Sequence, residues 1–534
     1  MVLWKKILTG VALTALVAGG TFYWRIARSG PSLVSVDPTI KLVEKPCDPA
    51  FSAARCGVVI APLDYSNPNG KTVEVGFVRF PAVGFGSNPT LQLVGGGPGS
   101  SITEDMKAGG SAAIIPTRVV LNDRSLLFIE PRGIALSTKL DCAIYKNMKL
   151  HPDHPSVKQL CANEIGPDLD YFTTENTAQD FERVRRALGI AELDLYGFSY
   201  GTMLSSVYAS RFPKHIRTLG LDGALPLTTW APFMPTHYSG MKRMFQQFCE
   251  RSNKCKTDEV MLALSWATNE LRKAPRPLKT SSKEVRLYVE PLQLDVAALA
   301  GLAATMPEPG EDEKTSSPVW RLPFVSALLT AYRKQDWTDL ESFAVEKLSI
   351  EKKQIDDPGY PSAAALGLTI TCQDWTVPWK LTSTIDQRRI EYKANATAYD
   401  QANPNAFAPF TAAEWGMRRG SLGYYDGSIS CPVRKTALTA QHNQTYTWPD
   451  ALPVLVLNAD YDFQTVNEDA QLAAAQFKKA QFAGFKHHGH AVLPESMCAV
   501  KLLREFLDNK RVADPMKCYD ADAAGVSLDK GTQK

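Results

Sequence analysis

Short apolar runs that alternate with helical patterns most limit what this 534-residue chain can fold into. Each run is bounded by Gly, Pro or Asp, and the runs occupy residues 91–94, 126–129, 193–196, 218–221 and 454–457. Runs of this length are typical of strands buried on both faces of a sheet. Segment 72–80 alternates apolar and polar residues and predicts an earlier strand.

Helical patterns lie between these predicted strands. In segment 176–188, Ala178, Phe181 and Val184 recur on one helical face, and Thr177 is the expected N-cap. Alternating strands and helices predict an α/β fold with a mostly parallel, doubly wound sheet.

The alternation stops in a long central segment that is rich in Trp, Met and Lys. It contains helical patterns at 259–272 and 318–334, and its acidic stretch 307–313 is expected to be an exposed loop. The strand pattern then resumes at residue 454. We therefore expect a core in two parts, 40–225 and 449–534, with a mainly helical cap inserted at 226–448.

The N-terminus has the pattern of an export signal. Lys5 and Lys6 precede an apolar run over 7–24, and Arg25 and Arg28 follow that run. Small residues within the run suit cleavage by a peptidase, but its length also suits a retained anchor in a thin bilayer. We expect residues 1–30 to be a signal peptide or a membrane anchor, and the rest of the chain to be periplasmic, secreted or otherwise outside the cytoplasm.

The ten cysteines are typical of a protein that resides in an oxidising compartment, as expected for an exported chain. An even number in an exported chain indicates disulfides, and the absence of Cys-x-x-Cys spacing makes metal binding the weaker alternative. Sequence alone does not determine the connectivity. Pairing of neighbours is the working hypothesis: Cys47 with Cys56, Cys142 with Cys161, Cys249 with Cys255, Cys372 with Cys431, and Cys498 with Cys518.

Composition and charge exclude several classes of protein. The chain has 59 Lys and Arg against 56 Asp and Glu, and 44% of its residues are hydrophobic. These proportions exclude a disordered or collagen-like chain. Without a basic stripe, a net charge of +3 also argues against nucleic acid as a partner.

The sequence Gly-Phe-Ser-Tyr-Gly at 197–201 follows a predicted strand and precedes a helical pattern at 202–212. In that setting a serine adopts strained backbone angles, and glycines two residues to either side let the neighbouring chain approach. Ser199 is therefore the candidate nucleophile, and the backbone N–H of Tyr200 is a candidate oxyanion donor. A Gly/Ser turn without chemistry is the alternative.

A second oxyanion donor is expected from the glycine-rich loop 95–101, which directly follows the strand predicted at 91–94. Gly97 is the candidate, because glycines let backbone amides approach a substrate carbonyl closely. A phosphate-binding loop or a plain turn is the alternative. The sequence argues against a phosphate-binding loop, because no Lys-Ser or Lys-Thr pair follows the glycines.

A serine nucleophile needs a histidine base, and that histidine needs a carboxylate. His490 follows the strand-like segment 481–485 near the C-terminus, where the chain order Ser, acid, His places the base. His487 and His488 are its rivals. Beyond the strand predicted at 454–457, Asp462 is the expected acid and Asp460 its rival, with a loop-capping role for Asp460.

These motifs resemble the α/β-hydrolases of the prolyl iminopeptidase and tripeptidyl aminopeptidase group, which are secreted or cell-envelope serine exopeptidases. The resemblance covers about residues 47–222 and 452–518. It rests on the opening segment 58–65, Gly-Gly-Pro-Gly at 96–99, the serine motif at 197–202, Leu-Asp-Gly at 221–223, Asp462 with Thr465, Gly489 with His490, and Cys498 with Cys518. The choice of Asp462 over Asp460 rests partly on this resemblance.

The chain departs from that group at several positions near the expected site. Glu-Pro-Arg-Gly-Ile-Ala stands at 130–135 where relatives commonly have Asp-Gln-Arg-Gly-Thr-Gly. Val466 replaces a usual proline, Ala459 a usual glycine, and the serines at 100–101 the glycine-containing end of the oxyanion loop. None of these changes replaces a residue of the expected triad. We therefore expect them to affect the substrate preference and not the catalytic chemistry.

The resemblance implies an exported serine aminopeptidase that releases short peptides or residues through an acyl-serine intermediate. An ester hydrolase with the same triad is the nearest alternative, and a binding protein with an inactive triad is another. The expected partner is a peptide or small ester substrate, and no cofactor or metal is required. Cap carboxylates that bind the substrate ammonium are unranked: Glu308, Glu311, Asp312 and Asp374.

Overall fold

The computed structural model describes residues 32–83, 88–107, 120–146, 155–227, 233–289, 292–304, 307–311, 318–357, 359–380, 382–418, 431, 445–521 and 525–527. The expected signal peptide or anchor at 1–30 lies outside the described residues. Of the helices that are described, none combines the length and the apolar character needed to cross a membrane.

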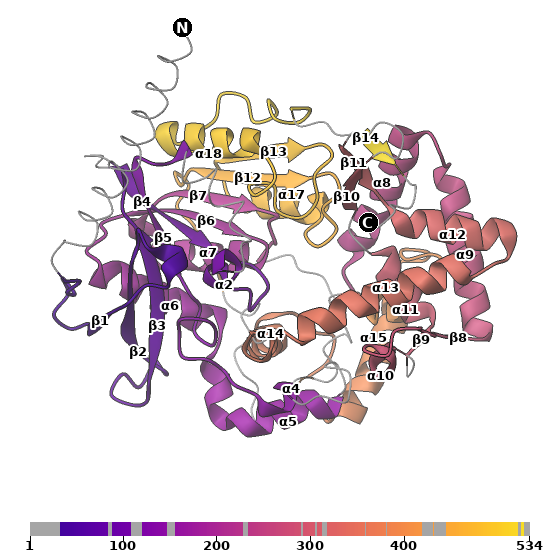
Figure 1. The fold of residues 1–534 in the computed structure, drawn as a ribbon, viewed down its shortest axis with the longest axis horizontal. Helices are drawn as coiled ribbons and strands as arrows, with labels where there is room; N and C mark the ends of the chain where they lie inside the picture. Colours follow the sequence, from indigo (N-terminus) through magenta and orange to yellow (C-terminus); the bar gives the residue numbers. More distant parts are fainter. Residues whose placement is uncertain are drawn as a thin grey trace, which may run out of the picture.

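The described part of the chain contains a nine-stranded sheet (Figure 1). In spatial order its strands are β1 (Leu42–Lys45), β2 (Arg55–Pro62), β3 (Thr72–Phe80), β5 (Arg124–Ile129), β4 (Asn88–Val94), β6 (Leu193–Phe198), β7 (Ile216–Asp222), β12 (Val454–Ala459) and β13 (Ala480–Phe485). From β1 to β5 neighbours pair antiparallel, and from β5 to β13 they pair parallel. Each run predicted as a strand lies inside one of these strands, which confirms the mostly parallel α/β sheet.

The two faces of the sheet pack into different cores, because side chains alternate along each strand. On β6, Leu195 belongs to the cluster that includes Phe181 and Leu204, from α6 (Thr174–Ala187) and α7 (Tyr200–Arg211). Its neighbour Tyr196 belongs to the cluster that includes Leu503, from α18 (Met497–Asn509). Helices therefore cover both faces, so most side chains along these strands are apolar.

Shorter elements connect these strands. They are η1 (Pro49–Phe51), α2 (Ile102–Lys107), α4 (Ala143–Lys146), α5 (Pro155–Ile165), η3 (Gly166–Tyr171), η4 (Pro213–His215) and α17 (Asn467–Ala475).

The N-cap predicted for α6 is wrong. Thr173 has the extended backbone of a cap, and its hydroxyl accepts the N–H of Asn176. Thr177 lies inside the helix, and its hydroxyl donates to the carbonyl of Thr173. The helix begins at Thr174, whose N–H is satisfied by Asp374, a partner 200 residues away that a local pattern does not reveal.

Between β7 and β12 the described chain is mainly helical. The helices are α8 (Pro235–Ser252), α9 (Thr257–Lys273), α10 (Arg286–Val289), α11 (Val296–Ala303), α12 (Pro323–Lys334), α13 (Thr338–Ile355), α14 (Tyr360–Asp374), α15 (Ile385–Ala402) and α16 (Ala412–Gly416). Most of them lie beside the sheet in Figure 1 and share a hydrophobic cluster with Phe245, Leu264, Leu328 and Trp415 among its members. We call this segment the cap.

Two expectations for the cap are wrong. The acidic stretch contains a strand, β10 (Glu308–Glu311), and the helix predicted from residue 318 begins only at Pro323, after the strand β11 (Pro318–Arg321). Pro323 favours the start of a helix, because its missing N–H is not needed there. β10 and β11 pair antiparallel, and β11 pairs with the distant β14 (Gly525–Ser527), so this sheet depends on residues far from the local pattern.

The cap also contains a two-stranded sheet, in which β8 (Arg276–Pro277) pairs with β9 (Gln293–Leu294).

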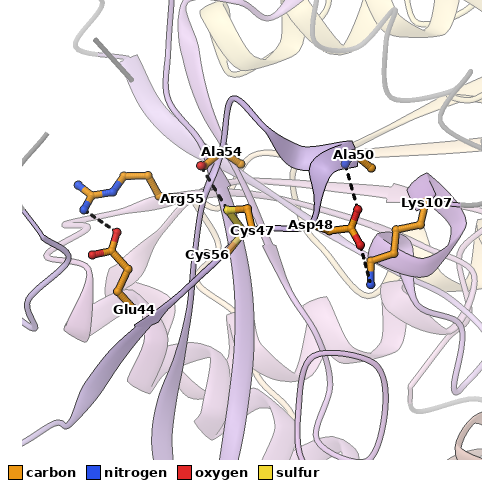
Figure 2. Close-up of a disulfide and its surroundings, with 8 residues drawn as sticks. All are labelled: Glu44, Cys47, Asp48, Ala50, Ala54, Arg55, Cys56 and Lys107. Atoms are coloured by element: carbon orange, nitrogen blue, oxygen red, sulfur yellow. Dashed lines mark hydrogen bonds and ion pairs between the residues drawn. A yellow bond between two sulfur atoms is a disulfide. The ribbon is translucent and has the colours of Figure 1, made fainter. Parts of the chain in front are cut away.

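The ten cysteines form five disulfides in the structure, in the neighbour pairs expected: 47 with 56, 142 with 161, 249 with 255, 372 with 431, and 498 with 518. Figure 2 shows the first, which joins the chain before η1 to β2. Beside it, Glu44 pairs with Arg55 at 2.9 Å, and the carboxylate of Asp48 accepts the N–H of Ala50.

Candidate active site

Ser199 occupies a sharp turn between β6 and α7. Its backbone angles, φ 57° and ψ −132°, are strained for a residue with a side chain. A Cβ on Gly197 would lie 2.3 Å from the carbonyl oxygen of Gly201, and one on Gly201 would lie 2.4 Å from that of Val94. Only glycine fits at either position, so these two residues allow the strained turn that carries Ser199.

His490 and Asp462 contact each other in the loops that follow β13 and β12. Nδ1 of His490 lies 3.0 Å from both carboxylate oxygens of Asp462. Thr465 donates its N–H and its hydroxyl to the same carboxylate, at 2.9 and 2.6 Å. Burial alone would lower the pKa of His490, but the charge and hydrogen bond of Asp462 raise it above its usual value. Asp462 therefore orients the ring and stabilises its protonated form.

Ser199 and His490 line the same cavity, which has a volume of about 520 Å³. Gly96 lies against the serine, since a Cβ there would be 2.7 Å from the Cβ of Ser199. The structure thus brings together Ser199, His490 and, behind the histidine, Asp462, three residues that are far apart in the sequence.

The two candidate oxyanion donors, Gly97 and Tyr200, come from the loop after β4 and from the start of α7. Gly97 lines the cavity with a φ of 108°, an angle that glycine adopts without strain. Tyr200 is the first residue of α7, and its buried phenol lies 2.7 Å from the hydroxyl of Thr174. The N–H groups at the start of α7 face outward along the helix axis, so this terminus favours a developing negative charge.

A sequence model of the α/β hydrolase fold matches residues 132–496, which is more than half of the chain. The chain belongs to the α/β hydrolase fold family. Serine protease Hip1 of Mycobacterium tuberculosis is 35% identical over 197 residues, 32% of this chain and 36% of that protein. Tripeptidyl aminopeptidase of Streptomyces lividans is 29% identical over 191 residues, 32% of this chain and 35% of that protein. The chain thus matches little more than a third of the length of these curated relatives.

A solved structure, proline iminopeptidase of Mycobacterium smegmatis, is 15% identical to this α/β hydrolase. The alignment covers 85% of this chain and 98% of that one, with a TM-score of 0.32.

The rival residues have other partners in this α/β hydrolase. Asp460 forms an ion pair with Arg251 and accepts the hydroxyl of Tyr519 at 2.9 Å. His487 packs edge-on against Tyr461, and burial lowers its pKa to about 4. Nδ1 of His488 lies 3.5 Å from Glu495. Asp462 and His490, in contrast, contact each other.

Helix α14 of the cap forms one wall of the cavity. Tyr360, Ala363, Gly367 and Thr371 all line it, at intervals of three or four residues that place them on one helical face. The oxyanion loop touches this wall, since a Cβ on Gly99 would lie 2.5 Å from the carbonyl oxygen of Ala363. The cap therefore reaches the cavity that contains Ser199.

The carboxylates suggested for binding a substrate ammonium are placed differently. Asp374 is buried and accepts the N–H and the hydroxyl of Thr174, so it joins the cap to α6. For Glu308 and Glu311 only the backbone, in β10, is described, and Asp312 lies outside the described residues. Asp105, which no sequence motif indicated, lines the cavity instead.

Two further acids near the site had no role assigned from the sequence. Glu130, one of the departures from the resembling group, accepts the hydroxyl of Ser101 and the N–H of Thr103, so it holds the far end of the oxyanion loop. Asp222 contacts the chain around His490. Their positions at the ends of β5 and β7 were the sequence signal that could have indicated a role at the site, because ligand sites in parallel sheets lie beyond the carboxyl ends of strands.

Among the described residues, no group of three or more His, Cys, Asp and Glu side chains is arranged to hold a metal ion.

Proposed function

We propose that this chain is an exported serine hydrolase that acts as an aminopeptidase, releasing short peptides or single residues from free N-termini. The observation that carries the proposal is the contact of His490 with Asp462 at the wall of the cavity that also contains Ser199. The peptidase preference draws support from the relatives named serine protease and tripeptidyl aminopeptidase. Export draws support from the five disulfides, which persist in oxidising compartments.

In this mechanism His490 is the base. Its Nδ1 faces Asp462, which leaves Nε2 to accept the proton of the Ser199 hydroxyl. The serine oxygen attacks the carbonyl carbon of the scissile amide, and the N–H groups of Gly97 and Tyr200 stabilise the oxyanion. His490 then passes its proton to the departing nitrogen, the C–N bond breaks, and an acyl-serine remains.

Water completes the cycle. His490 takes a proton from a water molecule, the resulting hydroxide attacks the acyl carbon, and the proton returns to the Ser199 oxygen as the acid product leaves. The cap supplies the selectivity in this proposal: residues of α14 line the cavity, and they would limit how much chain fits on one side of the serine. A walled cavity favours removal of terminal residues over cleavage within a long chain.

Labelling with a fluorophosphonate tests the activated serine. We expect the wild type to be labelled, Ser199→Ala to lose labelling, and Ser210→Ala, a control on the same helix α7, to keep it. An unlabelled wild type would instead indicate a binding protein with an inactive site.

A substrate panel tests the aminopeptidase preference. We expect peptide amides with a free N-terminus to be hydrolysed much faster than the same peptides after N-acetylation. Equal turnover of free and blocked peptides, or a strong preference for simple aryl esters, would reject aminopeptidase action and favour an ester hydrolase.

A further inference from the structure

Asp222 lies at the centre of the site without belonging to the triad. It is the last residue of β7, which pairs with β6 on one side and with β12 on the other. β6 leads into Ser199, and β12 leads into the loop of Asp462. The side chain of Asp222 is completely buried.

The backbone at Asp222 and Gly223 contacts all three segments of the proposed triad. The N–H of Ser199 donates to the carbonyl of Asp222 at 2.9 Å. Gly223 has a φ of 61°, and a Cβ there would lie 3.1 Å from a carboxylate oxygen of Asp462 and 3.3 Å from Cε1 of His490. This dipeptide therefore sets how closely the three segments approach one another.

The carboxylate of Asp222 binds the chain directly after His490. Its two oxygens accept the N–H groups of Val492 and Leu493, at 3.0 and 2.9 Å. Between His490 and these bonds lies Ala491, whose φ of 67° is unfavourable for a residue with a side chain. Such a conformation persists where the surroundings enforce it, and the two bonds to Asp222 do so here.

We propose that Asp222 is a positioning residue that holds the His490 loop in register with Ser199, through its backbone carbonyl on one side and its carboxylate on the other. This inference rests on the proposed function, since it assigns a purpose to the distance between nucleophile and base. A single buried acid would then govern whether the histidine reaches the serine.

Ionisation of Asp222 matters for this role, because a carboxylate accepts two N–H bonds more strongly than a carboxyl group does. Burial raises the pKa of Asp222 to about 6, while the bonds from Val492, Leu493 and Tyr196 act in the opposite direction. The ionisable groups that face it are Tyr196 from β6 and His490 from the loop after β13, with Asp462 behind the histidine. We therefore expect the hold on the loop to weaken as the pH falls through about 6.

Asp222→Asn is the direct test. The amide keeps the shape but loses the charge, and it places an NH₂ donor against one of the two N–H donors. We expect the rate of fluorophosphonate labelling and kcat to fall on the order of 100-fold, because small misplacements of reacting groups have effects of that size. KM should stay within about twofold, since Asp222 is not among the residues that line the cavity.

Tyr196→Phe is a second variant for the case in which Asp222→Asn fails to fold. It removes the hydroxyl that donates to Asp222 at 2.9 Å, so Asp222 should ionise less readily and the pKa of His490, which the charge of Asp222 raises, should fall. Tyr208→Phe is the matched control, because Tyr208 is also buried and donates to a carboxylate at 2.9 Å, that of Glu182. The control should leave the pKa of His490 unchanged.

Titration of His490 by NMR in the full chain gives a readout that needs no substrate. The negative charge of Asp222 raises the pKa of His490, so Asp222→Asn should lower that pKa, whereas Tyr208→Phe should not change it.

The outcomes separate this inference from the proposed function. A wild type that fluorophosphonate does not label would overturn the proposed function, and the histidine titration would still decide the role of Asp222. A labelled wild type with Asp222→Asn labelled at the same rate, or Tyr196→Phe with an unchanged pKa of His490, would overturn the inference. An unchanged pKa of His490 in Asp222→Asn would also overturn it.

Discussion

Asp374 of the cap accepts two hydrogen bonds from Thr174 of the core, one from the backbone N–H at 2.9 Å and one from the hydroxyl at 2.5 Å. The same hydroxyl lies 2.7 Å from the phenol of Tyr200, the residue after Ser199. Cap helix α14, the start of α6 and the serine turn are thereby connected through three polar side chains.

The first prediction concerns stability and pH. Burial raises the pKa of Asp374 from 3.8 to about 6, so over this interval the folded chain binds its proton more tightly than the unfolded chain does. The free energy of unfolding should therefore fall as the pH rises from about 4 to about 6, by up to about 3 kcal/mol from this residue. Asp374→Asn does not titrate, so urea unfolding at the two pH values should show a smaller decrease than in the wild type. An equal decrease would contradict this assignment.

The second prediction separates Asp462 from its supporting residue. Asp462→Asn should lower kcat by about 10⁴-fold with little change in KM, because the histidine loses both its orienting partner and the charge that stabilises its protonated form. The acidic limb of the pH profile should move to lower pH, since Asp462 raises the pKa of His490. In contrast, Asp460→Asn should retain most of the activity, because Asp460 contacts Arg251 and Tyr519 instead of His490. Steady-state kinetics across pH provide the measurement.

The third prediction concerns Thr465, which donates two hydrogen bonds to Asp462. Thr465→Val keeps the N–H and removes the hydroxyl, so kcat should fall about tenfold, the effect of one such bond. The change should be much smaller than that of Asp462→Asn. Equal losses in the two variants would mean that the hydroxyl has a more direct part in the reaction.

The fourth prediction compares two glycines with positive φ. Gly99→Ala should lower kcat/KM by about 10- to 100-fold, because a Cβ there would lie 2.5 Å from the carbonyl oxygen of Ala363 and would displace the oxyanion loop. Gly166→Ala is the matched control, since its φ is also positive at 71° and no atom lies within 4 Å of the added Cβ. The control should lose about 1 kcal/mol of stability and no activity. Similar kinetics for both variants would show that the contact with α14 does not support the loop.

The fifth prediction concerns the disulfide between Cys372 of α14 and Cys431. It closes a loop of 59 residues, whereas the one between Cys249 and Cys255 closes a loop of 6. Chain entropy predicts losses of about 4 and about 2 kcal/mol when each pair is replaced by serines. Urea unfolding of the two double variants tests the order, and a larger loss for the short loop would contradict it.

The sequence predicted the elements whose causes are local. Runs such as 193–196 are mostly apolar because helices cover both faces of the sheet, so those strands could be predicted. Ser199 could be predicted as the nucleophile because the glycines that permit its strained turn are its near neighbours, and His490 could be predicted as the base because it follows a strand. The choice of Asp462 over Asp460 also needed a family resemblance, since both aspartates follow the same strand.

The features that sequence reasoning missed depend on distant partners. Thr173 caps α6 while Asp374, 200 residues away, satisfies the next N–H, so the local pattern misplaced the cap at Thr177. Strand β11 was mistaken for part of a helix because one of its partners is β14. Asp222 reaches the N–H groups of residues 492 and 493, about 270 positions later, and no local spacing indicates such a contact.

The pairing of β14 with β11 also bears on the order of assembly during synthesis. Because β14 begins at residue 525 and β11 ends at residue 321, a ribosome delivers the third strand of this small sheet roughly 200 residues after the hairpin that receives it. Until then β11 has an unpaired edge, the kind of edge on which other chains can associate. A nascent or truncated chain that ends before residue 525 should therefore aggregate more readily than the 534-residue chain, even though the nine-stranded sheet and the serine turn have already been synthesised.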